Sequence, residues 1–321
     1  MEKERKRTFW DVIKGWFVEP DDMPKSMQRG KGRFVFCFVI VSLLHFIIFY
    51  IGVNYQSILL AFQSVDFIDD NGLVHYKYTL DNFRRFFEEM KLPDTVLPIA
   101  FKNTLIYFVL NTFILFPIGI ISSYFLYKKI WAHKTLRVLF YLPGLISGVV
   151  VVATFTGMTS LGGPIHQLVY NLFGIEMQSF YSDANTTKTI IAYEIWCGGL
   201  VTNFILLTGT MSRIPNEILE SAKLDGVGLW RELFQIVIPL IWDTVGVLFI
   251  MSFIGIFSAS GPIMLFKAGE RHWTISYWIF NQVTSGSYSY PAAVGLFLTV
   301  ISFPIVLLVR WLINRVEGVE Y

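Results

Sequence analysis

The chain has 321 residues, of which 54% are hydrophobic and only 16% are charged. A soluble domain carries about a quarter charged residues, so this composition excludes a soluble enzyme first. The net charge of +2 comes without a basic stripe beyond the charges that flank apolar stretches, which argues against a nucleic-acid partner. Cys37 and Cys197 lie in apolar stretches and are expected to act as small hydrophobic residues, not as a disulfide or a metal pair.

Residues 1–33 form a polar N-terminal tail with nine Lys and Arg residues. Within it, Phe9, Ile13 and Phe17 share one helical face near basic residues, a pattern typical of a helix lying in the membrane interface. A disordered basic tail with incidental aromatic residues explains the pattern equally well. The apolar stretch that follows has no small-residue cleavage site, so we expect a retained helix and not a signal peptide.

Apolar stretches long enough to cross a bilayer dominate the rest of the chain, and several contain no Asp, Glu, Lys or Arg at all. About 20 apolar residues cross the bilayer core as a helix. The sequence therefore predicts an all-α polytopic membrane protein with a single transmembrane domain, residues 34–321. Its six expected spans are about Phe34–Phe62, Ile99–Tyr127, Val138–Thr159, Thr189–Met211, Ile236–Phe257 and Pro291–Leu312.

The orientation follows from the Lys and Arg residues in the loops, which are enriched on the cytoplasmic side. With the N-terminus inside, 18 of the 26 Lys and Arg residues fall on the cytoplasmic side. We therefore expect both termini in the cytoplasm. On the outer side, Ile165, Leu168, Val169 and Leu172 repeat at helical spacing between Gly163-Pro164 and Gly174, which predicts a short surface helix.

The cytoplasmic loop Arg213–Pro239 has the pattern of a helix, a glycine turn and a second helix. Pro215 suits a first helical turn, and Gly226 suits the left-handed residue that ends a helix. Ile218, Leu219 and Ala222 would form one apolar face between them. The second helix is expected from about Leu229, with Trp230 and Phe234 towards the bilayer and Pro239 at the start of the fifth span.

The same loop resembles a known family. Its Glu220-Ser221-Ala222, Gly226 and Ile236-Val237-Ile238-Pro239 are similar to the EAA loop of binding-protein-dependent ABC importer permeases. From about Asn103 to Arg310 the chain resembles the maltose and glycerol-phosphate type, including Leu142–Gly144, Trp196, Asn203 and Ile214-Pro215. Ser221 replaces the usual Ala, Ile238 the usual Leu, and Ser258–Pro262 replaces a polar-aromatic stretch, which leaves the exact sugar open.

The resemblance implies a type I ABC importer permease fold and the mechanism of that family. The first helix of the loop would be a coupling helix that docks on a cytoplasmic ATPase, and ATP-driven closure would move the attached spans to give alternating access. The coupling residues implied are Glu220, Ser221, Ala222, Asp225, Gly226 and Pro239. The alternative is an interfacial helix-turn-helix that only connects two spans.

The implied assembly lies in the bacterial cytoplasmic membrane. It contains a second homologous permease subunit, two ATPase subunits and an extracytoplasmic solute-binding protein. The chain has no G-x-x-x-x-G-K-[ST] phosphate loop, so ATP and Mg would be used by the partner ATPase, and no cofactor or metal would bind here directly.

Polar residues within spans usually face a bundle interior or a cavity. Tyr107 and Asn111 on the second span, and Tyr193, Trp196 and Asn203 on the fourth, are candidates for a translocation path. Amide side chains and aromatic rings suit the hydroxyls and the apolar face of a sugar. The alternative is that the aromatic residues are interface anchors and that the Asn residues serve helix packing.

The sequence thus favours the permease subunit of a carbohydrate importer, for an oligosaccharide or related glycoside, with no catalytic residues of its own. An importer for a non-sugar solute is the first alternative, although no Lys or Arg lies at or between the candidate path residues of either span, where a phosphate would favour one. A polytopic membrane enzyme or scaffold is the second. The five His residues are scattered, and no H-E-x-x-H or paired-carboxylate site occurs.

Overall fold

The computed structural model describes residues 31–69, 74–174, 181–182, 185–198, 203–258, 262–266 and 268–316. The interfacial helix expected at Phe9–Phe17 lies outside these residues. The chain divides into two units, Met1–Leu59 and Leu60–Tyr321. In the first unit, α3 (Lys31–His45), the π-helical turn η1 (Phe46–Gly52) and α4 (Val53–Ala61) follow one another without a break. Large apolar side chains such as Phe49 and Tyr55 are exposed along them, as on a helix surrounded by lipid.

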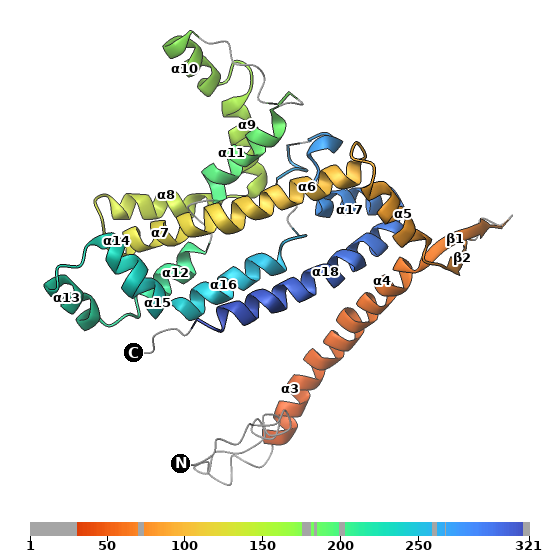
Figure 1. Ribbon diagram of the computed structural model, residues 1–321, viewed down its shortest axis with the longest axis horizontal. Helices are drawn as coiled ribbons and strands as arrows, with labels where there is room; N and C mark the ends of the chain where they lie inside the picture. Colours follow the sequence, from red (N-terminus) through yellow and green to blue (C-terminus); the bar gives the residue numbers. More distant parts are fainter. Residues whose placement is uncertain are drawn as a thin grey trace. The chain divides into compact units, whose positions relative to one another are not determined.

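The longest helical stretch of the second unit consists of α6 (Val96–Val109), η2 (Leu110–Leu115) and α7 (Phe116–Tyr127). Figure 1 shows it beside α16 (Trp242–Ile254) and α18 (Ser289–Ile313). Within the described residues, four helices are long and apolar enough to cross a membrane, or five if one sharply bent pair forms a single span. The expected fourth span, Thr189–Met211, is not in this count because residues 199–202 lie outside the described part.

The third span differs from the expectation. We predicted one helix over Val138–Thr159, but the structure has α8 (His133–Leu145) and α9 (Gly148–Thr159), separated by extended backbone at Ile146 and Ser147. Pro143 lacks the N–H that a helix interior needs, and Gly144 and Gly148 have low helix propensity on either side of the break. The apolar residues therefore follow one another without a gap in the sequence, but they are divided between two helices.

The start of the fifth span also differs. The second helix of the loop 213–239 runs through α14 (Leu229–Glu232), η3 (Leu233–Val237) and α15 (Ile238–Leu240). A bend of 81° then separates it from α16. The bend lies at Ile241, two residues after Pro239, where φ is −106° and ψ is 14°. Pro239 therefore lies within the loop's second helix, and α16 begins at Trp242.

A small β-element lies between α4 and α5 (Asp81–Met90). Strands β1 (Gln63–Ile68) and β2 (Val74–Tyr78) pair antiparallel, with an irregularity between Val65 and Phe67. The side-chain amide of Asn82, in α5, donates to the carbonyls of Ala61 and Gln63 at 3.2 and 2.8 Å. These bonds fix the hairpin against the amphipathic helix that follows it.

The remaining elements are short helices. α10 (Pro164–Phe173) begins and ends as the sequence predicted, with Gly174 in the left-handed region at φ +66°. The other elements are α11 (Thr186–Gly198), α12 (Phe204–Met211), α13 (Asn216–Leu224), η4 (Glu270–His272) and α17 (Ile275–Thr284). The side chain of Asn103 in α6 donates to the carbonyls of Arg271 and Trp273, both at 3.0 Å, and so holds the η4 segment on α6.

Candidate functional site

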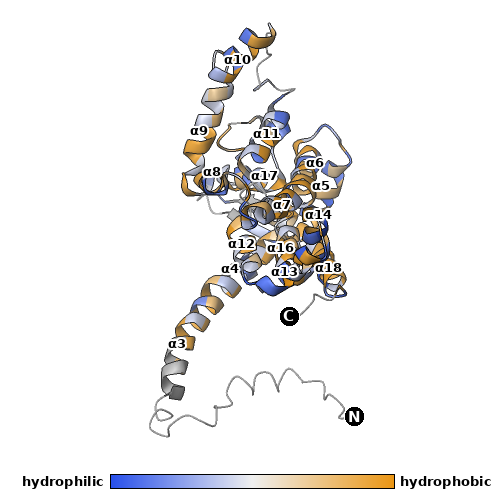
Figure 2. Ribbon diagram, turned by 90° about the vertical axis from the view of Figure 1, so that its left-hand side faces the viewer, coloured by the Kyte–Doolittle hydropathy of each residue, from blue (hydrophilic) through white to orange (hydrophobic). Residues whose placement is uncertain are grey.

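The loop 213–239 contains a short, mostly exposed helix with one buried edge. α13 begins after Pro215, and its buried residues are Leu219 and Ala222. Glu220, Ser221 and Asp225 are exposed, as a surface for a partner requires. Ala222 instead faces the chain's own interior, so its small size serves packing within this protein. In Figure 2 the helix is largely hydrophilic.

Gly226 ends α13 in the left-handed conformation that the sequence predicted, with φ +71°. The N–H of Val227 donates to the carbonyl of Ala222 and the N–H of Gly226 donates to the carbonyl of Lys223, both at 3.0 Å. This pair of bonds is the Schellman motif, which satisfies the last carbonyls of a helix. No atom lies within 4 Å of a Cβ built at Gly226. The glycine is therefore required by the backbone and not by crowding.

The loop is anchored to α7 by a buried ion pair that the sequence analysis missed. The Nζ of Lys128 lies 2.7 and 3.0 Å from the two carboxylate oxygens of Glu232. Their side chains are only 14% and 3% exposed. The Tyr124 hydroxyl donates to the carbonyl of Leu229 at 3.1 Å. Local sequence gave no signal for this contact, because its partners are 104 residues apart.

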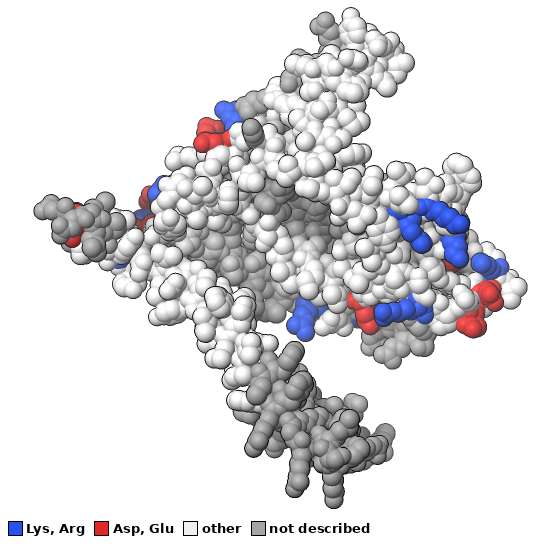
Figure 3. Space-filling model, turned by 180° about the vertical axis from the view of Figure 1, so that it is seen from behind, with Lys and Arg blue, Asp and Glu red and all other residues white. Residues whose placement is uncertain are grey.

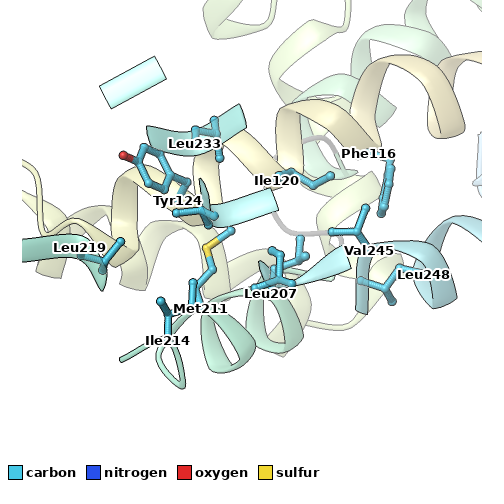
Figure 4. Close-up of a cluster of buried hydrophobic side chains, with 12 residues drawn as sticks. Phe116, Ile120, Tyr124, Leu207, Met211, Ile214, Leu219, Leu233, Val245 and Leu248 are labelled. Atoms are coloured by element: carbon cyan, nitrogen blue, oxygen red, sulfur yellow. The ribbon is translucent and has the colours of Figure 1, made fainter. Parts of the chain in front are cut away.

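A hydrophobic cluster next to this anchor joins five parts of the chain. Figure 4 shows side chains from α7, α12, α13, α14–α15 and α16 pointing into one shared interior. Tyr124 of α7, Met211 of α12 and Leu233 of η3 are fully buried there, and Leu219 connects α13 to it. The exposed helix α13 is therefore fixed to the helices behind it.

The charge distribution agrees with a cytoplasmic face at this end of the second unit. Figure 3 shows Lys and Arg side chains gathered where Figure 1 places the α7–α8 turn and α13, and a largely uncharged surface next to them. The α7–α8 turn carries Lys129 in addition to the paired Lys128, and the first turns of α8 carry Lys134 and Arg137.

The candidate path residues Tyr193 and Trp196 lie together in an aromatic cluster on α11. Phe155 of α9 packs against both rings, with centroids at 5.3 and 5.6 Å. Phe266 lies 5.4 Å from Tyr193. Tyr193 is 7% exposed, whereas Trp196 is 49% exposed and presents its ring outwards. Phe155 and Phe266 were not predicted, because only the tertiary fold brings them here.

Two cavities lie on either side of this cluster. One, of about 450 Å³, is apolar and lies between Trp196 and the α8–α9 break at Pro143 and Ile146. The other, of about 420 Å³, is more polar and is lined by Phe266 together with Thr156, Tyr181, Thr186 and His272. Aromatic faces beside hydroxyl groups suit a ligand that has both apolar and hydroxyl surfaces.

The other candidate path residues are placed differently. Tyr107 is buried in α6, and Asn111 donates its side-chain amide to the carbonyl of Tyr107 at 3.0 Å. Asn203 has a left-handed backbone at φ +59° and precedes α12. It therefore lies outside α11, the helix that carries Tyr193 and Trp196. Within the described residues, no group of three or more His, Cys, Asp or Glu residues is arranged to hold a metal.

Comparison with known proteins identifies the family of this fold. Residues 104–318 match the model of the binding-protein-dependent transport system inner membrane component family. The chain belongs to this family. The permease is 28% identical to protein LplB of Bacillus subtilis over 286 residues, with 86% of each chain covered. It is 26% identical to the polygalacturonan/rhamnogalacturonan transport system permease protein YteP of the same organism, with 88% of each chain covered.

Two further comparisons concern shared regions and the fold. The maltose/maltodextrin transport system permease protein MalF of Klebsiella aerogenes is 28% identical over 54% of the permease and 34% of MalF. A solved bacterial ABC transporter involved in import of the acidic polysaccharide alginate has a chain that superposes with a TM-score of 0.75. At 19% identity it covers 91% of the permease and 99% of that chain. The importer permease fold expected from the sequence is thereby confirmed.

Proposed function

We propose that this permease forms part of an ABC importer for a carbohydrate, and that its α13 docks on a cytoplasmic ATPase. The observation that carries the proposal is the construction of α13: an exposed outer face on a helix fixed by its buried edge to α7, α12 and α16. A helix that only connected two spans would need neither the exposed Glu220 and Asp225 nor this anchoring.

The proposed coupling residues are those expected from the sequence. Glu220, Ser221 and Asp225 would meet the ATPase, Ala222 would pack α13 inwards, and Gly226 would set the angle between α13 and α14. Pro239 would lie near the end of the second loop helix, just before the bend at Ile241. ATP and Mg²⁺ would be used on the ATPase subunits, and both termini of this chain would be cytoplasmic.

A carbohydrate substrate is supported by the aromatic cluster and by two relatives, which are named for transport of polygalacturonan/rhamnogalacturonan and of maltose/maltodextrin. Trp196 would offer a stacking face, and Tyr107, Asn111, Tyr193 and Asn203 would line other parts of the path. A complete path needs a second, homologous permease subunit. A solute-binding protein would deliver the substrate, as in the alginate transporter solved with a pentasaccharide-bound periplasmic protein.

Co-purification from native membranes tests the assembly. A tagged permease should retain an ATPase and a second polytopic chain in stoichiometric amounts, identified by mass spectrometry. A permease that purifies with neither would be the enzyme or scaffold considered above. Calorimetric titration of the co-purifying or co-encoded solute-binding protein with neutral and acidic oligosaccharides tests the substrate class, and binding of none of them would favour a non-sugar solute.

A further inference from the structure

The α7 helix and the loop helix α14 are joined by an ion pair, a hydrogen bond and an aromatic contact. Besides the ion pair, the Tyr124 hydroxyl bonds to the Leu229 carbonyl, and the rings of Phe125 and Trp230 pack edge to face at 5.6 Å. These contacts lie within one helical turn of each other on both helices. The two helices are therefore held against sliding and against separation.

The burial of Lys128 and Glu232 makes their contact a rigid one. The pairs Arg85–Glu89 and His75–Asp69 have side chains that are 25–61% exposed. Glu232 is 3% exposed, and both of its oxygens face the ammonium group. Exposed ion pairs exchange readily with water, whereas a buried charge that loses its partner is strongly disfavoured. The two helices are thus expected to move together or not at all.

The α7 helix leads directly to the candidate path. It continues without a break through η2, which carries Asn111, into α6, which carries Tyr107. A displacement of α7 along its axis would therefore reach these residues through one helical stretch.

We propose that Lys128 and Glu232 are positioning residues that make the second span move together with α13. The connection runs from α13 through α14 and the ion pair to α7, which belongs to the second span. The fourth and fifth spans are connected to α13 by the chain itself, but α7 is connected to it only through tertiary contacts. The inference rests on the proposed function, because it assumes that an ATPase moves α13. It goes beyond that function because it names the contact, the Lys128–Glu232 ion pair, through which the movement of α13 would reach the second span.

Distance measurement between two spin labels tests this arrangement in the assembled transporter. Labels are attached at Trp131→Cys, on the α7–α8 turn, and at Asn216→Cys, at the start of α13, after Cys37 and Cys197 are replaced by alanine. Both label sites are exposed, and Trp131 is 93% exposed. The complex is measured without nucleotide and after trapping with ATP and orthovanadate, and its ATPase rate is recorded in parallel.

In the wild-type complex we expect one narrow distance distribution that is the same in both states. Glu232→Gln should broaden or shift the distribution in the trapped state, and the charge swap Lys128→Glu with Glu232→Lys should restore it. Arg231→Gln, which removes the neighbouring exposed charge, should leave it unchanged. If the ion pair only stabilised the fold, the Glu232→Gln distance distribution would be the same with and without trapped nucleotide.

Two results would overturn the inference. One is a wild-type distance that changes between the states, and the other is a Glu232→Gln distribution that matches wild type in both. If the Glu232→Gln complex fails to assemble, the wild-type distance still tests the inference, because that measurement does not depend on a substitution at the ion pair. A complex that lacks any ATPase would instead overturn the proposed function, and this inference with it.

Discussion

The backbone N–H of Val227 donates to the carbonyl of Ala222 across Gly226, and this bond fixes the direction in which α13 leaves the membrane-embedded helices. Ala222 is buried and its neighbours Ser221 and Lys223 are exposed. The turn therefore determines which face of α13 points outwards. The first prediction concerns Gly226, the left-handed residue of this turn.

Replacement of Gly226 should uncouple the transporter without preventing membrane insertion. Gly226→Ala places a Cβ on a left-handed residue at a cost of about 1 kcal/mol, and Gly226→Pro cannot adopt the required φ at all. We expect reduced uptake for the first variant and loss of uptake with continued ATP hydrolysis for the second. The measurement is solute uptake per ATP in proteoliposomes.

Gly209→Ala is the matched control, because Gly209 lies inside α12 with no atom within 4 Å of an added Cβ and no positive φ. It should behave as wild type. Normal transport by Gly226→Pro would remove the coupling role of this turn.

Reversal of the charge at Glu220 should weaken the association with the ATPase. Glu220 is exposed on α13, so Glu220→Arg should leave the fold intact while it opposes a basic partner surface. We expect the amount of ATPase retained on the purified permease to fall. Lys129→Glu, an equally large charge change on the α7–α8 turn, should retain the ATPase, and equal loss in both variants would indicate a non-specific charge effect.

Truncation of Trp196 should lower uptake without changing the basal ATPase rate. A stacked aromatic ring contributes about 0.5–1.5 kcal/mol, so Trp196→Ala is expected to lower uptake by up to roughly tenfold. Ile195→Ala removes a similarly exposed apolar side chain one position away and should have little effect. Equal uptake by the two variants would exclude Trp196 from the path.

Loss of the Asn103 side chain should loosen the η4 segment. Asn103→Ala leaves the part-buried carbonyl partners of two hydrogen bonds without this donor, at a cost of about 2 kcal/mol. Amide hydrogen exchange of residues 268–275 should then become roughly 30-fold faster. Lys102→Ala, at an exposed neighbour, should leave the exchange unchanged. Unaltered exchange in Asn103→Ala would mean that other contacts hold the segment.

The features that the sequence predicted best are those with local causes. Proline and glycine mark both ends of α10 and of α13, so their positions could be determined from neighbouring residues alone. The break at Ile146 and the bend at Ile241 were missed because hydropathy continues across both. In each case a proline lies two or three residues earlier, which was the available signal.

The contacts that join the elements could not be predicted. Lys128 was counted only as a cytoplasmic charge and Glu232 was given no role, because their meeting depends on how α7 packs against α14. The same reason applies to Phe155 and Phe266 around Tyr193. Asn203 was expected on the fourth span with Tyr193 and Trp196, but it has a left-handed backbone and lies outside α11.

A photo-reactive amino acid at position 220 gives the most direct measurement of the central claim. In the intact complex, illumination should attach the ATPase subunit to α13, while the same residue at position 172, on α10, should not capture it. Capture of no ATPase from position 220, or equal capture from position 172, would contradict the account.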